Sequence, residues 1–196
     1  MPGMTDISPQ DVHDFWFGAS DDPAFGQPRE AWFKKDDAFD EEIRTKFGET
    51  VEAAIEGGLT EWEDNGQGSL ALILLLDQFA RNIFRGSGKS FAGDVRTRQV
   101  AAAAIAAGIE KDLNIPQRVF LYLPYEHSED MADQHRSMDL FNSLPQYEGR
   151  DNQIDYAQRH LDIVERFGRF PHRNTSLGRV STADEEEYLA QPDAGF

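Results

Sequence analysis

The 196-residue sequence contains no cysteine, which excludes disulfide bonds, thiol nucleophiles and cysteine-ligated metals. It also lacks a long apolar run. The two longest such runs, residues 70–76 and 100–107, have seven and eight residues, whereas a membrane-spanning helix needs about 20. No basic region followed by an apolar stretch opens the chain, so no secretory signal is recognisable. We therefore expect a cytoplasmic protein with one domain over residues 1–196, since domains usually hold about 100–200 residues.

Positive charge is also scarce, with 19 basic against 36 acidic residues and a formal net charge of −17. Such an excess repels phosphate backbones and anionic lipid surfaces, which argues against a nucleic acid or a membrane as the main partner. Ten of the basic residues nevertheless lie in residues 81–98 and 159–179, which together hold only three acidic residues. An anionic partner would find its charge complement in these two segments.

Apolar residues recur at helical spacing along nearly the whole chain, and no segment alternates as a β-strand would. Residues typical of helix ends divide this pattern into roughly eight helices joined by short loops. These signals are Ser8 before Pro9, the pair Gly57 and Gly58, Ser128 with two acidic neighbours, and Ser181 with Thr182. The pattern predicts an all-α fold, a single domain of stacked antiparallel helix pairs.

The stretch LALILLLDQFARNIFRG, residues 70–86, joins the most apolar run to a group of polar residues. Its first half is apolar all round, which predicts burial on every side. The polar side chains then gather on one side of the helix: Asp77, Gln78, Arg81, Asn82 and Arg85. Either the helix leaves the core for a solvated face, with an Asp77–Arg81 pair at four-residue spacing, or this stripe forms the wall of a polar cavity.

The stretch GSGKS, residues 86–90, fails as a phosphate-binding loop. Ile83 stands where the motif requires a glycine, and a helix rather than a strand precedes it. We interpret it as a linker whose Ser90 caps the next helix. No Ser-His-Asp order or GxSxG elbow is present either, which leaves nucleophilic hydrolysis with little support.

A second group of polar residues lies in YEHSEDMADQH, residues 125–135. The spacings match neither HExxH nor a pair of ExxH motifs, so we expect no metal and no cofactor. Capping of the following helix by Ser128 and its acidic neighbours, Asp130 among them, explains part of the stretch. It does not explain Glu126 and His127, which are candidate acid–base groups.

The stretch RFGRFPHRN, residues 166–174, is broken by Gly168 and Pro171. A stiff turn should therefore present its polar side chains, which are Arg169, His172, Arg173 and Asn174. Loops of this kind often carry binding groups. The alternative is that the arginines cap helix carbonyls. Upstream, His160 lies on an apolar helix face, as does His13 near the N-terminus, and we interpret both as structural core histidines.

Four long stretches resemble a bacterial family catalogued as domain of unknown function 924. They are LLLDQFARNIFRG, FLYLPYEHSED, RFGRFPHRNTSLGRVSTADEEEYL and WFKKDDAFDEEIRTKF. The resemblance covers about residues 11–189. It implies a fold similar to tetratricopeptide-like helical proteins, in agreement with the predicted helix pairs. It implies no activity, cofactor or catalytic residue.

The leading functional hypothesis is a polar pocket, lined by arginine and histidine, for a small anionic ligand. The ligand-binding residues would be Asp77, Gln78, Arg81, Arg85, Glu126, Asp130, Arg169, Arg173 and Asn174, with His127 and His172 as proton-transfer groups. This hypothesis requires the helix of residues 70–85, His127 and residues 172–173 to converge on one partly buried cavity. The alternative is a non-enzymatic adaptor that holds a peptide or protein on the helical stack.

Overall fold

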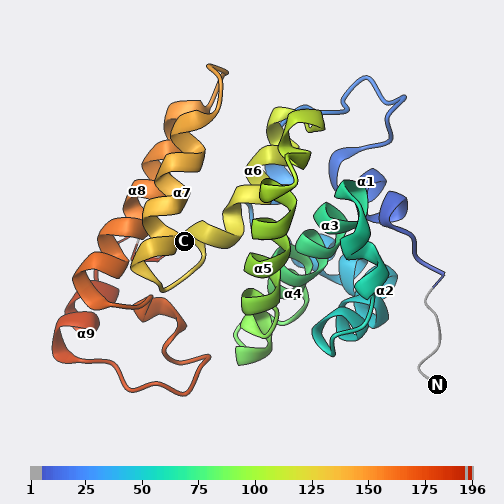
Figure 1. Cartoon of the computed structure of the whole chain (residues 1–196). Coiled ribbons are helices and arrows are strands. Elements are labelled where there is room, and N and C mark those ends of the chain that lie inside the picture. The colour runs from blue at the N-terminus through green and yellow to red at the C-terminus, as the bar shows by residue number, and fades with distance from the viewer. Residues whose placement is uncertain (1–5, 193, 196) are drawn as a thin grey trace. The chain divides into compact units, whose positions relative to one another are not determined.

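The computed structural model describes residues 6–192 and 194–195, and in these residues it contains helices and turns but no strand (Figure 1). The predicted all-α class is therefore confirmed. The chain divides into two compact units: the first unit comprises residues 1–85 and 89–124, and the second unit comprises residues 86–88 and 125–196. This division does not test the single-domain organisation, which stays a prediction.

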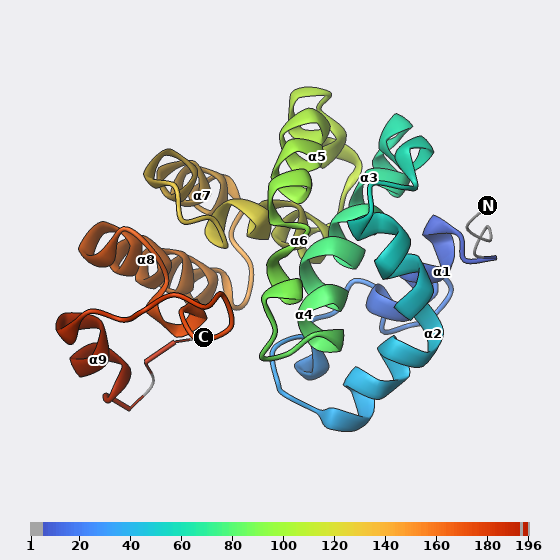
Figure 2. The same cartoon turned by 90° about the horizontal axis from the view of Figure 1, so that it is seen from below.

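The first unit is built around one continuous helical segment, residues 66–83, which is buried throughout residues 68–77. Its elements are α1 (Pro9–Phe17), α2 (Asp37–Ile55), the short η2 (Thr60–Asp64), α3 (Gly66–Ile73), the π-helical η3 (Leu74–Phe79), α4 (Ala80–Ile83), α5 (Asp94–Ala106) and most of α6 (Ile115–Glu126). α1 and α5 pack against α3, while α2 packs along η3 and α4 (Figure 2). No helix of residues 6–192 combines the length and apolarity that crossing a bilayer requires.

Local signals place the helix ends of the first unit. The Ser8 hydroxyl accepts a hydrogen bond from the Asp11 amide, and the Asp11 carboxylate accepts one from the Ser8 amide at 2.8 Å. This capping box, followed by Pro9, fixes the start of α1 as predicted. Behind it, the Trp16 ring lies 5.3 Å from Phe79 and 5.4 Å from Phe120, centroid to centroid, so aromatic packing joins α1 to the buried segment.

The second unit contains a helical hairpin and a short C-terminal helix. These elements are α7 (Met131–Ser143), α8 (Arg150–Phe167) and α9 (Ala183–Leu189). α7 and α8 run side by side and are joined by a short loop, as Figures 1 and 2 show. Gly168 adopts φ +70°, a left-handed conformation that a residue with a side chain rarely adopts, and it ends α8 where the sequence predicts. The hairpin agrees with the predicted helix pairs, and the tetratricopeptide-like arrangement stays a prediction.

Two predicted caps are wrong. Ser90 lies in a short 3-10 turn, Gly88–Phe91, where its hydroxyl donates to the Phe84 carbonyl at 2.7 Å, and Gly93 is the N-cap residue of α5. Asp130 rather than Ser128 caps α7: its carboxylate accepts from the Ala132 amide at 2.8 Å. α5 thus begins without a side-chain cap, and α7 begins at an aspartate, which residue preference also allows.

Gly68 marks the closest backbone approach in the core of the first unit. A Cβ built there would lie 2.2 Å from the carbonyl oxygen of Trp62. We expect Gly68→Ala to lower the free energy of unfolding by about 1–3 kcal/mol, because overpacking against backbone cannot relax easily. Gly48 in α2 is the matched control, since a Cβ there meets nothing within 4 Å, and Gly48→Ala should stabilise by about 0.5–1 kcal/mol. Urea denaturation measures both, and equal effects of one sign would contradict this packing.

Candidate functional site

In the first unit, the apolar run meets its polar residues inside a π-helical segment. η3 spans Leu74–Phe79, and π-helical turns frequently occur at functional sites. The Asp77 side chain is only 1% exposed, and its Oδ1 lies 2.8 Å from Nη1 of Arg81. The predicted ion pair between Asp77 and Arg81 is therefore present. The accompanying expectation that this side of the helix faces solvent is wrong at Asp77, which is buried. The helix carries its carboxylate into the protein interior.

Arg81 lies between two carboxylates. Its Nη2 is 3.1 Å from Oδ1 of Asp94, and its Nη1 also donates to the Asp77 carbonyl at 2.7 Å. Burial alone would lower the pKa of the Arg81 guanidinium, but the charges of Asp77 and Asp94 outweigh it and raise this pKa above the usual value. The contacts of Arg81 fit a structural network, the alternative to a ligand site.

The remaining polar residues of this helix also bond to carboxylates of the first unit. Gln78 donates to Oδ2 of Asp77 at 2.6 Å. Asn82 and Arg85 donate to Oδ1 of Asp40, at 2.6 and 3.0 Å. Burial of Asp40 raises the pKa of its carboxyl, but the hydrogen bonds from Arg85 and Asn82 reverse this and leave it below the usual value. The binding roles predicted for Gln78 and Arg85 stay untested, and the proposal below does not use them.

In the second unit, two histidines and a carboxylate come together from segments far apart in the sequence. Glu126 lies in the last turn of α6, His127 follows it, and His160 lies in the middle of α8. Each of the three offers one ligand atom, and these atoms all lie within 4.8 Å of one another. The two imidazole rings are 6.0 Å apart, centroid to centroid. We call these three residues the histidine cluster.

The turn after α8 extends the histidine cluster. The ring of Phe170 lies 5.5 Å from His160 and 5.6 Å from His172, centroid to centroid. The guanidinium carbon of Arg173 lies 4.5 Å from the centroid of the same ring, in cation–π geometry, and the residue is only 6% exposed. His160, His172 and Arg173 therefore lie around one aromatic ring within this unit.

His160 is the member of the cluster that the sequence analysis treated as structural. Its Nδ1 lies 2.8 Å from the Tyr156 carbonyl oxygen and 3.2 Å from Oε1 of Glu126. Burial, followed by the nearby charges of His127 and Arg173, holds the pKa of His160 well below its usual value, so the ring is neutral at pH 7. A carbonyl oxygen can only accept, so Nδ1 carries the proton and Nε2 carries a lone pair.

Two bidentate ion pairs hold the turn that carries Phe170. Arg179 donates to both oxygens of Glu129, at 2.7 and 2.9 Å, and Glu129 in turn accepts from the Phe170 amide at 2.8 Å. Arg169 donates to both oxygens of Glu185, at 2.6 and 2.8 Å. No sequence pattern indicates these roles of Glu129, Arg179 and Glu185, because their partners lie far along the chain.

Three residues predicted to bind ligand have contacts that hold the backbone, and their binding roles stay untested. Arg169 is paired as above, and Asn174 donates to Oε2 of Glu185 at 3.2 Å. Asp130 caps α7 and is exposed. Asp77 and Arg81 belong to the first unit, whereas His127 and residues 172–173 belong to the second. Convergence of all of them on one cavity stays a prediction.

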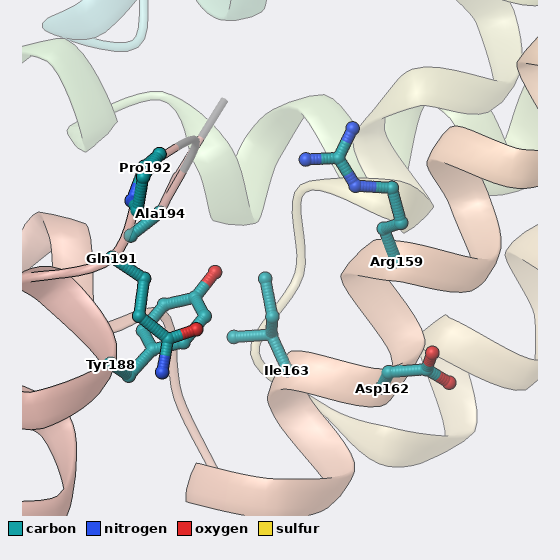
Figure 3. A pocket seen from close by; sticks show the side chains of 7 residues that line it. All are labelled: Arg159, Asp162, Ile163, Tyr188, Gln191, Pro192 and Ala194. Carbon is teal, nitrogen blue, oxygen red and sulfur yellow. The ribbon is translucent and has the colours of Figure 1, made fainter.

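The second unit also has a surface pocket of about 300 Å³ that no sequence motif indicated. Figure 3 shows its two sides. Arg159, Asp162 and Ile163 project from α8, and Tyr188, Gln191, Pro192 and Ala194 come from α9 and the segment after it. Its wall contains one arginine and one aspartate, so it offers less concentrated charge than the surroundings of the histidine cluster.

Comparisons with known proteins are consistent with this fold. The family model described as "Bacterial protein of unknown function (DUF924)" matches residues 12–193. A solved structure, that of the protein of unknown function ATU0120 from Agrobacterium tumefaciens, is similar, with 41% sequence identity and a TM-score of 0.81. The match covers 94% of this chain and 97% of that chain. No curated protein matches the sequence.

The contacts of Arg81 lead to a prediction on stability. Arg81→Ala would leave the Asp77 carboxylate buried without its cation, and we expect a loss of about 3–5 kcal/mol in the free energy of unfolding. Adding Asp77→Asn should recover part of this loss. Lys34→Ala is the control, because both partners of the Lys34–Glu30 pair are largely exposed, and it should change stability by less than about 1 kcal/mol. A loss equal to that of the control would show that Arg81 is not needed for folding.

The Arg169–Glu185 pair leads to a prediction on pH dependence. The hydrogen bond from Arg169 lowers the pKa of Glu185 to about 2, from an ordinary value of 4.5. Because the folded-state pKa is depressed, this stabilisation is complete above pH 4.5 and is lost as the pH falls toward 2. Glu185→Gln should therefore lower the urea midpoint at pH 7 but have progressively less effect below pH 4.5. The exposed Glu187, altered to Gln, is the control. A deficit that stays constant from pH 7 to pH 3 would contradict the assignment.

Proposed function

The chain belongs to the DUF924 family of bacterial proteins of unknown function, and from that premise we propose that it binds a small anionic ligand in its second unit and performs acid–base chemistry there. One observation carries the proposal. Within one compact unit, the histidine cluster brings together two imidazoles and a buried carboxylate. A third imidazole, that of His172, and the buried guanidinium of Arg173 lie beside the Phe170 ring, which also contacts His160. Imidazole titrates near neutral pH, so a group rich in histidine suits acid–base chemistry.

Arg173 would supply the binding charge. It is 6% exposed and packs on the face of Phe170, so its position is fixed before a ligand arrives. A guanidinium offers N–H donors in a rigid fork that matches a carboxylate or a phosphate. Because the local dielectric is low, an anion gains more from this charge than it would from an exposed arginine. His127 and His172 are partly exposed, which gives the ligand access from solvent.

Proton transfer would involve imidazoles in different environments. His160 is neutral, with its proton on Nδ1 toward the Tyr156 carbonyl, and its Nε2 is the basic atom. His127 lies beside it and is partly exposed. Titratable groups in unlike surroundings are typical of acid and base partners. The proposed proton-transfer groups are therefore His127 and His172, as the sequence predicts, together with His160.

The proposal includes a cytoplasmic location and excludes nucleic acid as a partner. A chain without cysteine needs no oxidising compartment, and a net charge of −17 opposes binding to a phosphate backbone. The pocket for an anion would then be a local cationic site on an acidic protein. The tetratricopeptide-like adaptor that binds a peptide remains the alternative outcome of the test below.

Thermal-shift measurements with inorganic phosphate and with small mono- and dicarboxylates test the proposal. A ligand at 100 times its Kd should stabilise the protein by about 2.7 kcal/mol. We expect Arg173→Met to abolish this stabilisation, and His172→Gln, at a partly exposed position, to weaken it without loss of fold.

Arg166→Met is the matched control, because Arg166 also lies over an aromatic ring, that of Phe167 at 4.6 Å, but is exposed. It should leave ligand stabilisation unchanged. Stabilisation that survives in both Arg173→Met and His172→Gln would overturn the proposed site. Stabilisation by peptides alone would favour the adaptor.

A further inference from the structure

We propose that Glu126, His127 and His160 form a binding site for a divalent first-row transition-metal ion. Among the residues that the structure describes, these three are the group whose histidine and acidic side chains could hold a metal ion together, with ligand atoms within 4.8 Å of one another. Two imidazole nitrogens and one carboxylate oxygen are a ligand set that zinc and non-haem iron use in proteins, with positions left for other ligands.

The size of the group suits such an ion. Metal–nitrogen and metal–oxygen bonds to zinc are about 2.0–2.2 Å long. Three ligand atoms no more than 4.8 Å apart can close around an ion at that distance through small side-chain rotations. Glu126 and His160 are 3% and 4% exposed, so two of the three ligands are already held by packing. His127 is partly exposed and leaves a route for the ion.

The surroundings of the group orient its ligands. Metal-binding histidines nearly always donate their second ring N–H to a carbonyl or a carboxylate. His160 does so: its Nδ1 lies 2.8 Å from the Tyr156 carbonyl oxygen, so Nε2 would be its ligand atom. Oε1 of Glu126 lies 3.2 Å from the same Nδ1, so the carboxylate is in contact with this imidazole.

A buried glutamine stiffens the segment that carries the other two ligands. Gln134 is fully buried in α7, and its Nε2 donates to the carbonyl oxygens of Glu126 at 2.7 Å and Ser128 at 2.6 Å. The backbone on both sides of His127 is thus fixed from a neighbouring helix. Such second contacts, made by a residue with no ligand role of its own, are what a preorganised site requires.

The inference deepens the anion-binding part of the proposed function and rests on it for the use of the ion, though not for ion binding itself. With the ion bound, His127 and His160 serve as ligands, and His172 is the remaining proton-transfer group. The charge of Arg173 acts on His160 and would oppose a bare cation nearby. An anion bound between the metal and the guanidinium would remove that opposition. The substrate class is then a small carboxylate or phosphate that binds the open metal positions with one oxygen.

The three-residue pattern could not be recognised in the sequence. Glu126 and His127 are adjacent, while His160 follows 33 residues later in a different helix. Motifs such as HExxH place their ligands on one helix and can be read from spacing. This group depends on the contact of Glu126 with His160, 34 residues apart, whereas the expectation of no metal rested on local spacing.

Titration of the chelator-treated full chain with Zn²⁺ by calorimetry, and with Co²⁺ by visible absorption, tests the inference. We expect one equivalent to bind the wild type, and His160→Gln and Glu126→Gln to weaken binding by at least about tenfold. His135→Gln is the matched control, since His135 is an exposed histidine on α7 nearby in the sequence, and it should bind as the wild type does. Circular dichroism checks that each variant folds.

His127→Cys provides a test at a partly exposed position that does not depend on losing the buried ligands. A thiolate at that position should add a sulfur-to-Co²⁺ charge-transfer band in the near ultraviolet if residue 127 binds the ion. Wild-type protein that takes up neither ion, or a Co²⁺ complex of His127→Cys without that band, would overturn the inference.

The two proposals can fail separately. If the metal-free protein is stabilised by phosphate in an Arg173-dependent way and binds no Zn²⁺ or Co²⁺, the metal site is wrong and the anion site stands. If one equivalent of metal binds through His160 and no phosphate or carboxylate stabilises the metal-loaded protein, the metal site stands and the anion site is wrong.

Discussion

The Arg179–Glu129 ion pair fixes the backbone of Phe170, whose ring packs beside the histidine cluster. Glu129 accepts the Phe170 amide at 2.8 Å, and Arg179 donates to the Phe170 carbonyl at 3.0 Å, so the pair clamps both polar groups of one residue. Phe170 then sets the positions of its ring neighbours His160, His172 and Arg173. The pair is half-buried and bidentate, the geometry in which an arginine–carboxylate contact is strongest.

The two units treat buried charge in different ways. In the first unit, Asp77 is paired with Arg81 and Asp40 is paired with Arg85. Each buried carboxylate thus has a matching arginine. In the second unit, matched pairs hold the turn after α8, and His160, His172 and Arg173 lie around its Phe170 ring. Unlike titratable groups in proximity are typical of sites that bind or transfer protons.

Local signals were enough for the helices but not for the site. Ser8 with Pro9, and Thr182 with Glu185, form the caps that their sequence pattern indicates, and Gly168 ends its helix as expected. The histidine cluster and its clamp instead depend on pairs separated by 34, 41 and 50 residues. Charge and residue type showed which segments of the second unit carry the polar groups. Only the packing of the helices shows that His160, which has the pattern of a core residue, lies beside Glu126.

Nitrogen-15 NMR of the five histidine side chains tests the central claim, that the histidine cluster is a binding site, most directly. At pH 6 the account expects His160 to be neutral with its proton on Nδ1, because burial lowers its pKa well below the usual value. On addition of Zn²⁺ with phosphate, the signals of His127, His160 and His172 should shift, while those of His13 and His135 should not. A His160 that is protonated at pH 6, or signals from residues 127, 160 and 172 that do not respond, would contradict the account.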